Sequence, residues 1–203
     1  MTPRKIDKSK KKQTILLAAI KVFSEKGVKN AKIADIAYEA GIGKGTIYEY
    51  FRSRDEIFIE TFNYMLREMN KEFINELQKT RPPVDKIKAM NKIIFSGLTK
   101  FTVETASIFI DFWAEGIRNQ GYSGKGIINL KELYNEFRQE LMQVLEDGIK
   151  AGQFRKINTL ETASAFLASI DGLLLQWIID PAVFNLKNVS ETNLDIFLKG
   201  IVK

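Results

Sequence analysis

The stretch from Asn30 to Arg54 limits the possible folds of this chain more than any other part of the sequence. Apolar residues recur at helical spacing from Lys32 to Ala40 and again from Lys44 to Phe51. Between these ranges lies Gly41-Ile42-Gly43, a turn in which glycine adopts a positive φ without steric cost. A small alanine in the first range lets the second helix cross closely, and Ile47 packs between the two. The spacing predicts a helix-turn-helix.

The rest of the chain also shows helical periodicity, and no alternating pattern typical of a strand occurs in it. We therefore expect an all-α protein of about nine helices, with ends set by glycines, prolines and capping residues. A capping box, Ser53 to Glu56, opens a long fourth helix that stops at Arg81-Pro82-Pro83. The other expected helices are Ser9–Lys26, Lys32–Ala40, Lys44–Phe51, Val84–Phe101, Glu104–Asn119, Ile127–Ala151, residues 159–179 and Ser190–Val202.

The residue types that are missing exclude several functions. The chain has no cysteine and no histidine, which removes disulfides, thiolate chemistry, histidine bases and nearly all zinc sites. We therefore expect no metal site and no cofactor, and an enzyme is the least favoured class. No apolar run reaches the roughly 18 residues of a membrane span, and the basic N-terminus does not resemble a signal peptide. These observations predict a cytoplasmic protein that does not enter a membrane.

Positive charge is concentrated at one end of the chain. Residues 1–54 carry 13 Lys and Arg against 5 Asp and Glu, whereas residues 55–203 carry 18 against 20. Such an asymmetry is typical of a protein whose first part meets a polyanion. The alternative is a solubilising basic tail, since the range from Lys8 to Lys12 alone supplies four of the positive charges.

Three cations stand at the starts of expected helices, where the helix dipole disfavours positive charge. These are Lys32, Lys44 and Arg54. Any one of them could be a solvated surface residue. Three in so short a stretch favour compensation by an anion, and helix N-termini with added cations are phosphate sites. We expect these three side chains to hold the phosphates of a nucleic acid.

The same stretch resembles the DNA-binding part of the TetR family of bacterial transcriptional repressors. The resemblance covers about residues 12 to 60, and the remainder matches only in helix number and length. The matching pattern is Ile15-Leu16-x-Ala18-Ala19-x3-Phe23-x3-Gly27, followed by Ile36-Ala37-x2-Ala40-Gly41-Ile42-x-Lys44-Gly45-Thr46-Ile47-Tyr48-x-Tyr50-Phe51-x-Ser53-Arg54-x2-Ile57.

The resemblance implies an N-terminal DNA-binding domain, residues 1–54, and a helical effector-binding and dimerisation domain, residues 55–203. It also implies a homodimer formed by the last two helices and a palindromic operator on double-stranded DNA. By position, the DNA-facing residues would be Lys32, Lys44, Gly45, Thr46, Tyr48, Glu49, Tyr50 and Arg54. Glu49 would either accept from a cytosine amino group or point to solvent.

The sequence departs from the family pattern at the helix starts. Ala31-Lys32 and Gly43 stand where the family usually has Ser or Thr, and Arg54 replaces a common lysine. Asn30 is the only obvious substitute cap for the second helix. Capping and phosphate contacts at these ends are therefore expected to differ from those of the family.

Two further sets of residues follow from the apolar content of the later helices. Aromatic and methionine side chains could line an adaptable apolar effector pocket, although each alone is more simply a core residue: Phe62, Met65, Met69, Phe95, Leu98, Phe109, Phe112, Trp113, Phe137 and Leu141. The last two helices present more apolar surface than one small bundle hides, which predicts a dimer interface from Phe166, Ile170, Leu174, Trp177, Leu194, Phe197 and Ile201.

Carboxylates in apolar helical surroundings must be exposed or paired. Asp111, Glu115 and Asp171 have such surroundings and would meet either a cationic ligand or an arginine such as Arg118. We therefore expect a sequence-specific, ligand-responsive DNA-binding regulator, a repressor released from its operator by a small hydrophobic effector. The alternative is a non-specific nucleoid-type protein, whose DNA binding would fall with salt but hardly depend on sequence.

Overall fold

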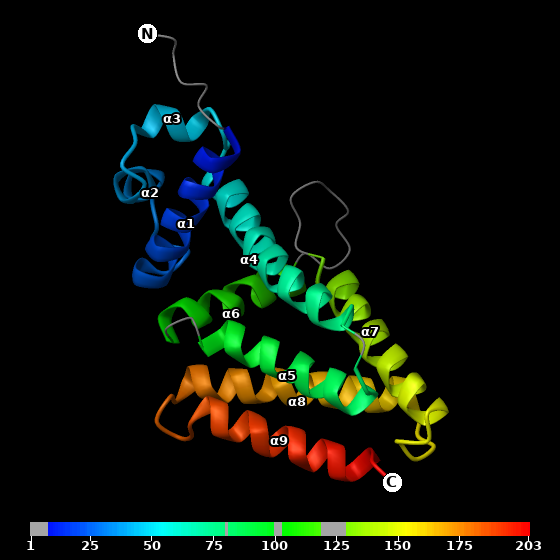
Figure 1. The fold of residues 1–203 in the computed structure, drawn as a ribbon. Coiled ribbons are helices and arrows are strands. Elements are labelled where there is room, and N and C mark those ends of the chain that lie inside the picture. The colour runs from blue at the N-terminus through cyan, green and yellow to red at the C-terminus, as the bar shows by residue number, and fades with distance from the viewer. Residues whose placement is uncertain (1–7, 80, 100–102, 119–128) are drawn as a thin grey trace. The chain divides into compact units, whose positions relative to one another are not determined.

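The computed structural model describes residues 8–79, 81–99, 103–118 and 129–203. Within these ranges the chain forms nine α-helices and no strand, which confirms the all-α prediction (Figure 1). The helices are α1 (Lys8–Lys26), α2 (Ile33–Glu39), α3 (Lys44–Tyr48), α4 (Arg54–Leu77), α5 (Pro83–Thr99), α6 (Val103–Arg118), α7 (Leu130–Lys150), α8 (Thr159–Ile179) and α9 (Leu186–Ile201). The glycines and polar residues from Gln120 to Gly126 predict a loop, and this stretch lies outside the described residues.

The last helix begins four residues earlier than the sequence analysis placed it. Asn185 is its N-cap, and the side-chain oxygen of Asn185 accepts a hydrogen bond from the backbone N–H of Asn188. Asparagine is among the strongest N-caps because it satisfies an otherwise unpaired helix N–H. The start expected at Ser190 was therefore wrong, since the signal at Asn185 was overlooked.

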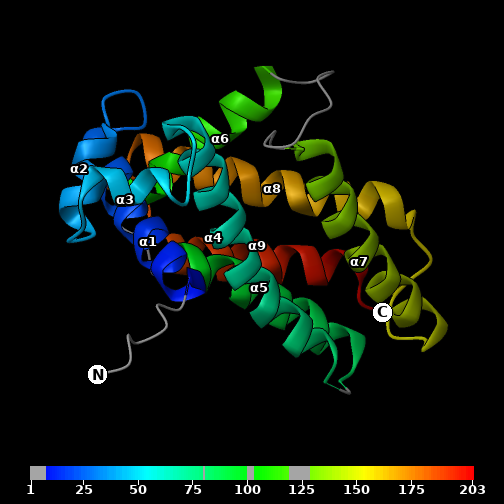
Figure 2. The same ribbon diagram turned by 90° about the horizontal axis from the view of Figure 1, so that it is seen from above.

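The chain divides into two compact units. The first comprises residues 1–67 and 104–128, and the second comprises residues 68–103 and 129–203. Helix α4 begins in the first unit and ends in the second. Helix α6 belongs to the first unit although it is distant from α1 to α3 in the sequence (Figure 2). The domain division expected at residue 54 stays a prediction.

The core of the first unit contains a cluster of phenylalanine rings from α1, α4 and α6. Phe112 of α6 stacks on Phe58 of α4 with ring centroids 4.3 Å apart and meets Phe62 at 4.1 Å. Phe23 of α1 contacts Phe58 edge-on at 5.8 Å, and Phe109 is edge-on to Phe62 at 6.5 Å. These five residues are called the aromatic cluster below. Aromatic pairs of these geometries add about 0.5–1.5 kcal/mol each beyond simple burial.

In the second unit, α5 packs on α7 and α9, and α8 packs on α7 and α9. Phe166 and Phe197 join α8 to α9 with ring centroids 4.3 Å apart. Asn193 of α9 also donates a hydrogen bond to Ser169 of α8 at 2.9 Å. The turn between α7 and α8 contributes Phe154, which is fully buried.

Phe154 depends on a glycine in α7. A Cβ added at Gly148 would overlap the ring of Phe154, so only glycine leaves room for it. The backbone at Phe154 also forms an isolated bridge with Val202, since Arg155 N–H donates to Ile201 at 2.9 Å and Lys203 N–H donates to Gln153 at 3.1 Å. This small assembly ties the turn after α7 to the end of α9.

Helix α8 is long and apolar enough to cross a membrane by length and composition, the one such helix among the described residues. Its most apolar 18-residue window has a mean hydropathy of 1.5, and 28% of that window is buried inside the structure. The sequence analysis expected no such segment, so this part of the prediction was too strict. The core helix of a soluble protein passes the same test, and α8 packs on α7 and α9.

Candidate nucleic-acid interface

Helices α2 and α3 are joined by the tight turn that the sequence predicted. Gly41 has φ of +63°, and the backbone N–H of Ile42 donates to the carbonyl of Ala37 at 3.0 Å. Ala37 is almost fully buried and Ile47 fully so, as expected of the residues that hold two crossing helices together. The described residues therefore form a helix-turn-helix.

The N-cap of α2 is Lys32, and an acidic residue in the first turn, not Asn30, binds its backbone N–H. The backbone N–H of Lys32 donates to the carboxylate of Asp35 at 3.0 Å, and the Lys26 ammonium of α1 lies 2.7 Å from the same carboxylate. The hydrogen bond from Lys26 and then that from the Lys32 backbone hold the pKa of Asp35 below its usual value. Asn30 instead donates to the carbonyl of Lys26 at 3.1 Å, so its expected role as a cap of α2 was wrong.

Ion pairs on the surface of the first unit link α1 to its neighbours. Lys21 pairs with Glu39 of α2 at 2.9 Å, and this contact raises the pKa of Lys21. Lys12 pairs with Glu60 of α4 at 2.8 Å and lies over the ring of Phe51 at 5.4 Å. Exposed pairs of this kind contribute at most about 1 kcal/mol each. Their effect is to restrict the orientation of α2 and α4 on α1.

Most of the sequence-predicted DNA contacts lie on the surface of α3 and of the start of α2. Lys32, Lys44, Gly45, Glu49 and Tyr48 are exposed, the last to 50%, whereas Thr46 and Tyr50 are half-buried. No ion pair of Lys32 or Lys44 occurs among the described residues. Their ammonium groups are therefore available to an external anion.

The sequence analysis missed one exposed aromatic residue on this unit. Tyr38 of α2 has 88% of its surface exposed. Tyr38 lies off the apolar face of α2 formed by Ile36 and Ala37, so its ring is open to solvent or to an external partner. That off-face position was the signal in the sequence that would have identified it.

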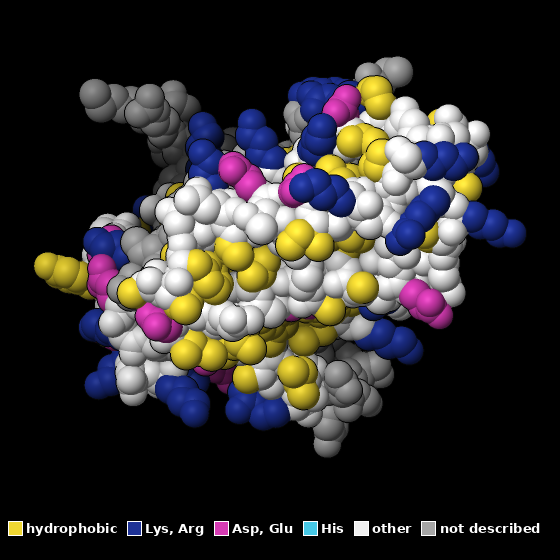
Figure 3. All heavy atoms as spheres, turned by 90° about the horizontal axis from the view of Figure 1, so that it is seen from below, with side chains coloured by type: hydrophobic (Ala, Val, Ile, Leu, Met, Phe, Trp, Pro, Cys, Tyr) yellow, Lys and Arg dark blue, Asp and Glu magenta, His cyan; other side chains and the backbone are white. Residues whose placement is uncertain are grey.

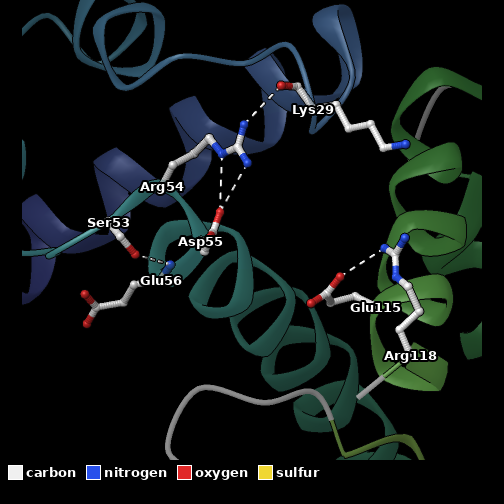
Figure 4. Close-up of polar contacts among 7 residues, drawn as sticks. All are labelled: Lys29, Ser53, Arg54, Asp55, Glu56, Glu115 and Arg118. Atoms are coloured by element: carbon white, nitrogen blue, oxygen red, sulfur yellow. Dashed lines mark hydrogen bonds and ion pairs between the residues drawn. The ribbon is translucent and has the colours of Figure 1, made fainter. Parts of the chain in front are cut away.

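Arg54 differs from the two lysines because its guanidinium has partners within the chain (Figure 4). Nη1 donates to the backbone carbonyl of Lys29 at 3.0 Å. Nε and Nη2 lie 3.4 and 3.2 Å from the carboxylate of Asp55. Next to it, Ser53 accepts from the N–H of Glu56 at 3.0 Å, which is one half of the expected capping box.

The other half of that box has a different partner. The carboxylate of Glu56 accepts a hydrogen bond from the backbone N–H of Arg52 at 2.6 Å. In a usual capping box the carboxylate of Glu56 would instead accept from the backbone N–H of Ser53, the capping residue. The consecutive residues Arg52, Ser53 and Arg54 thus each form a polar contact at the start of α4.

The residues expected to line an effector pocket divide between the two units. Phe62, Met65 and Phe112 are buried in the first unit, where Phe109 and Trp113 are half-buried. In the second unit Phe95 and Leu141 are buried and Phe137 is half-buried, with its ring 6.0 Å from that of Phe73. The side chains of Met69 and Leu98 lie outside the described residues.

The three carboxylates expected to be exposed or paired are all half-buried. Glu115 of α6 pairs with Arg118 at 3.0 Å, the arginine named from the sequence. Asp171 of α8 accepts a hydrogen bond from the hydroxyl of Tyr134 in α7 at 2.8 Å. Burial raises the pKa of Asp171, and the hydrogen bond from Tyr134 opposes that shift.

Several residues expected at a dimer interface already pack inside the chain. Phe166, Ile170, Leu174 and Ile201 are buried. Trp177, Leu194 and Phe197 are half-buried. The exposed apolar side chains of the last helices are different ones, namely Leu160, Leu175, Ile179 and Ile196, together with Val183 in the turn between α8 and α9. The dimer interface expected from the sequence stays a prediction, and these exposed side chains add to the apolar surface of the last two helices.

The geometry of the first unit defines a class of protein. A helix-turn-helix with an exposed second helix, exposed lysines at the starts of α2 and α3 and a basic N-terminal quarter is a DNA-binding module. Helices α4 to α9 add a larger helical part to this module. The chain thus has the architecture of a helix-turn-helix regulator.

Comparison with known proteins identifies the family. Residues 15–61 match the model of the bacterial regulatory proteins of the tetR family, and residues 83–199 match the model of the C-terminal part of BetI-type transcriptional repressors. The chain belongs to the TetR family and is a DNA-binding transcriptional regulator. These matches support the regulator and not the non-specific nucleoid-type alternative.

Individual relatives agree with this assignment over the whole chain. The transcriptional repressor KstR2 of Rhodococcus jostii is 25% identical over 205 residues, which cover 99% of this chain and 98% of that protein. A transcriptional regulator of Saccharomonospora viridis, solved with choline, has the same fold with a TM-score of 0.82, 23% identity and coverage of 96% and 99%. FadR of Bacillus subtilis, solved with stearoyl-CoA, has a TM-score of 0.73, 21% identity and coverage of 93% and 98%.

Proposed function

We propose that this regulator is a homodimeric, cytoplasmic repressor that binds a palindromic operator through α3 and leaves it when a small apolar effector binds. The observation that carries the proposal is the exposure of Lys32 and Lys44 at the edges of the helix-turn-helix. Lysine ammonium groups in this state neutralise phosphates and fix the position of a reading helix on the duplex.

Helix α3 supplies the groups that would face the bases. Gly45 has no neighbour within 4 Å of an added Cβ, so its surface is open to a close approach by DNA. The exposed ring of Tyr48 can contact a phosphate or a thymine methyl, and Thr46 can donate a hydrogen bond. Glu49 is exposed and can accept from a cytosine amino group. Half-buried Tyr50 would present only its hydroxyl edge.

The proposed dimer contact is the exposed face of α8. Ala165, Ala168 and Gly172 follow each other at helical spacing and continue into Leu175 and Ile179, the latter 74% exposed. Small residues let two helices approach closely, and the flanking apolar side chains would then be removed from water. Figure 3 shows the surface on the side where α8 and α9 lie in Figure 1. Hydrophobic side chains run across the middle of this surface.

The proposed effector acts on the aromatic cluster of the first unit. Phe62, Phe109 and Phe112 meet between α4 and α6, and the adjoining Met65 and Trp113 belong to the same helices. A ligand that separates these rings would displace α4 and, through Phe58 and Phe23, the helix-turn-helix. An effector shifts this equilibrium only by its differential affinity for the two states. The relatives solved with stearoyl-CoA and with choline supply the first compounds to test.

The proposal is tested by titrating the protein into labelled DNA from the region next to its own gene. We expect a salt-sensitive shift that is lost with a scrambled duplex of the same length, and a weaker shift for Lys44→Ala. Sequence-independent binding, or no binding, would contradict it. A parallel titration with an acyl-CoA and with choline tests the effector. Release of DNA by the acyl-CoA supports an apolar effector, whereas release by choline alone would contradict it.

The dimer is tested on its own. Gly172→Glu places a charge in the middle of the proposed α8 contact, whereas Glu161→Gln alters an exposed residue near the start of the same helix. Sedimentation velocity is expected to give a dimer for the second variant and a monomer for the first. A dimer that survives Gly172→Glu would exclude this surface as the interface.

A further inference from the structure

Arg54 is a cation at a helix start whose charged group is held by other groups of the chain. Its side chain is 39% exposed, and all three guanidinium nitrogens have partners in the chain. Figure 4 shows the guanidinium between the carbonyl of Lys29 and the carboxylate of Asp55, while the side chain of Lys29 extends away from it. A phosphate contact by Arg54 would require these hydrogen bonds to break.

The carbonyl that Arg54 holds lies in the connection between α1 and α2. This connection starts at Gly27, with φ of +72°, and contains Ala31, which is almost fully buried. Asn30 closes its first half by donating to Lys26. The contact to Lys29 therefore joins the segment that determines where α2 starts to the first turn of α4, 25 residues later.

The side chain of an arginine suits this task because its planar fork donates in several fixed directions. A lysine has the same charge but presents three donors on a single nitrogen, so it cannot reach two separated acceptors in this way. The choice of arginine at this position therefore matters through geometry and not only through charge.

We propose that Arg54 is a positioning residue that locks the connection between α1 and α2 to the start of α4, and that it acts on operator binding through the orientation of the helix-turn-helix. This inference rests on the proposed function for its DNA readout. Movement of the start of α4 is transmitted to α2 through the Arg54–Lys29 contact, without a phosphate bound by Arg54.

The salt dependence of DNA binding separates this role from a phosphate contact. Each phosphate contact contributes about 0.9 to the slope of log affinity against log salt. Removal of a phosphate-binding side chain from both protomers thus lowers the slope by about 1.8, which is the result expected for Lys44→Ala. Arg54→Ala is expected to weaken binding on the order of tenfold, as for a lost charge-assisted hydrogen bond, with the wild-type slope.

Arg54→Lys provides the matched control because it keeps the charge and removes the fork. A positioning role predicts that Arg54→Lys weakens binding nearly as much as Arg54→Ala. A phosphate role predicts near wild-type binding for Arg54→Lys and a reduced slope for Arg54→Ala. That second pattern would overturn the proposal.

Hydrogen exchange of the free protein supplies a readout that needs no DNA. Loss of the contact is expected to accelerate exchange of the amides from residue 28 to residue 32 in both Arg54 variants and not in Lys44→Ala. Unchanged exchange there would also overturn the proposal. If the wild-type protein fails to bind DNA selectively, the proposed function fails, whereas the exchange result still decides the role of Arg54.

Discussion

Replacement of Phe112 by leucine is expected to remove the aromatic contacts that join α6 to α4 while keeping most of the buried apolar volume. Phe112 is fully buried and meets two rings of α4, those of Phe58 and Phe62, at 4.3 and 4.1 Å. Two aromatic pairs at about 0.5–1.5 kcal/mol each give about 1–3 kcal/mol. Phe112→Ala would add a cavity and cost about 3–5 kcal/mol.

The measurement is urea unfolding of wild type, Phe112→Leu, Phe58→Leu and the double variant. The double-mutant cycle is expected to give a coupling energy of about 0.5–1.5 kcal/mol for the stacked pair, with m-values unchanged. The control cycle pairs Phe112 with Phe23, which contacts Phe58 edge-on at 5.8 Å and has no ring contact with Phe112 among the described residues. A coupling between Phe58 and Phe112 no larger than the control value would refute the reasoning.

The remaining predictions concern two carboxylates and one glycine. Asp171→Asn is expected to raise the melting temperature at pH 7, because burial raises the pKa of Asp171 and its ionisation opposes folding. That gain vanishes in melts recorded below the ordinary aspartate pKa of 3.8. Asp35→Asn has the opposite effect: the pKa of Asp35 is lowered, so its stabilisation is present above pH 3.8 and is lost in acid, and equal melting curves at pH 7 would contradict this. Gly148→Ala is expected to lower the free energy of unfolding in urea by about 1–3 kcal/mol, because the ring of Phe154 must move. Gly152→Ala is the control: this glycine is exposed and has φ of +72°, so its substitution introduces backbone strain without a steric overlap.

Local signals predicted the helices well. The Gly41 turn, the prolines at the start of α5 and the Asn158 cap of α8, whose side chain accepts from the backbone N–H of Glu161 at 3.2 Å, each act within a few residues. These local signals can therefore be recognised in a single sequence. The cap at Asn185 is also a local signal. The start of α9 was placed wrongly because the prediction followed the apolar repeat and did not consider this cap.

Contacts between distant residues could not be predicted in this way. Arg54 has the charge of a phosphate ligand, and only the fold brings the carbonyl of Lys29 within 3.0 Å of it. Phe166 is apolar and belongs to an apolar helix, yet periodicity does not say whether its neighbour is Phe197 of the same chain or a second protomer. Charge and hydrophobicity identify candidate contact residues, and the packing of the folded chain decides which partner each residue contacts.

The fit of Phe154 against Gly148 also has an evolutionary consequence. The two positions are six residues apart on either side of the end of α7, and the ring occupies the space that a side chain at position 148 would need. A homologue that acquires alanine or a larger residue at 148 must therefore lose volume at 154, and the two positions should covary. Reversion of one member alone would be harmful in either background, so the pair constrains the order in which substitutions can accumulate.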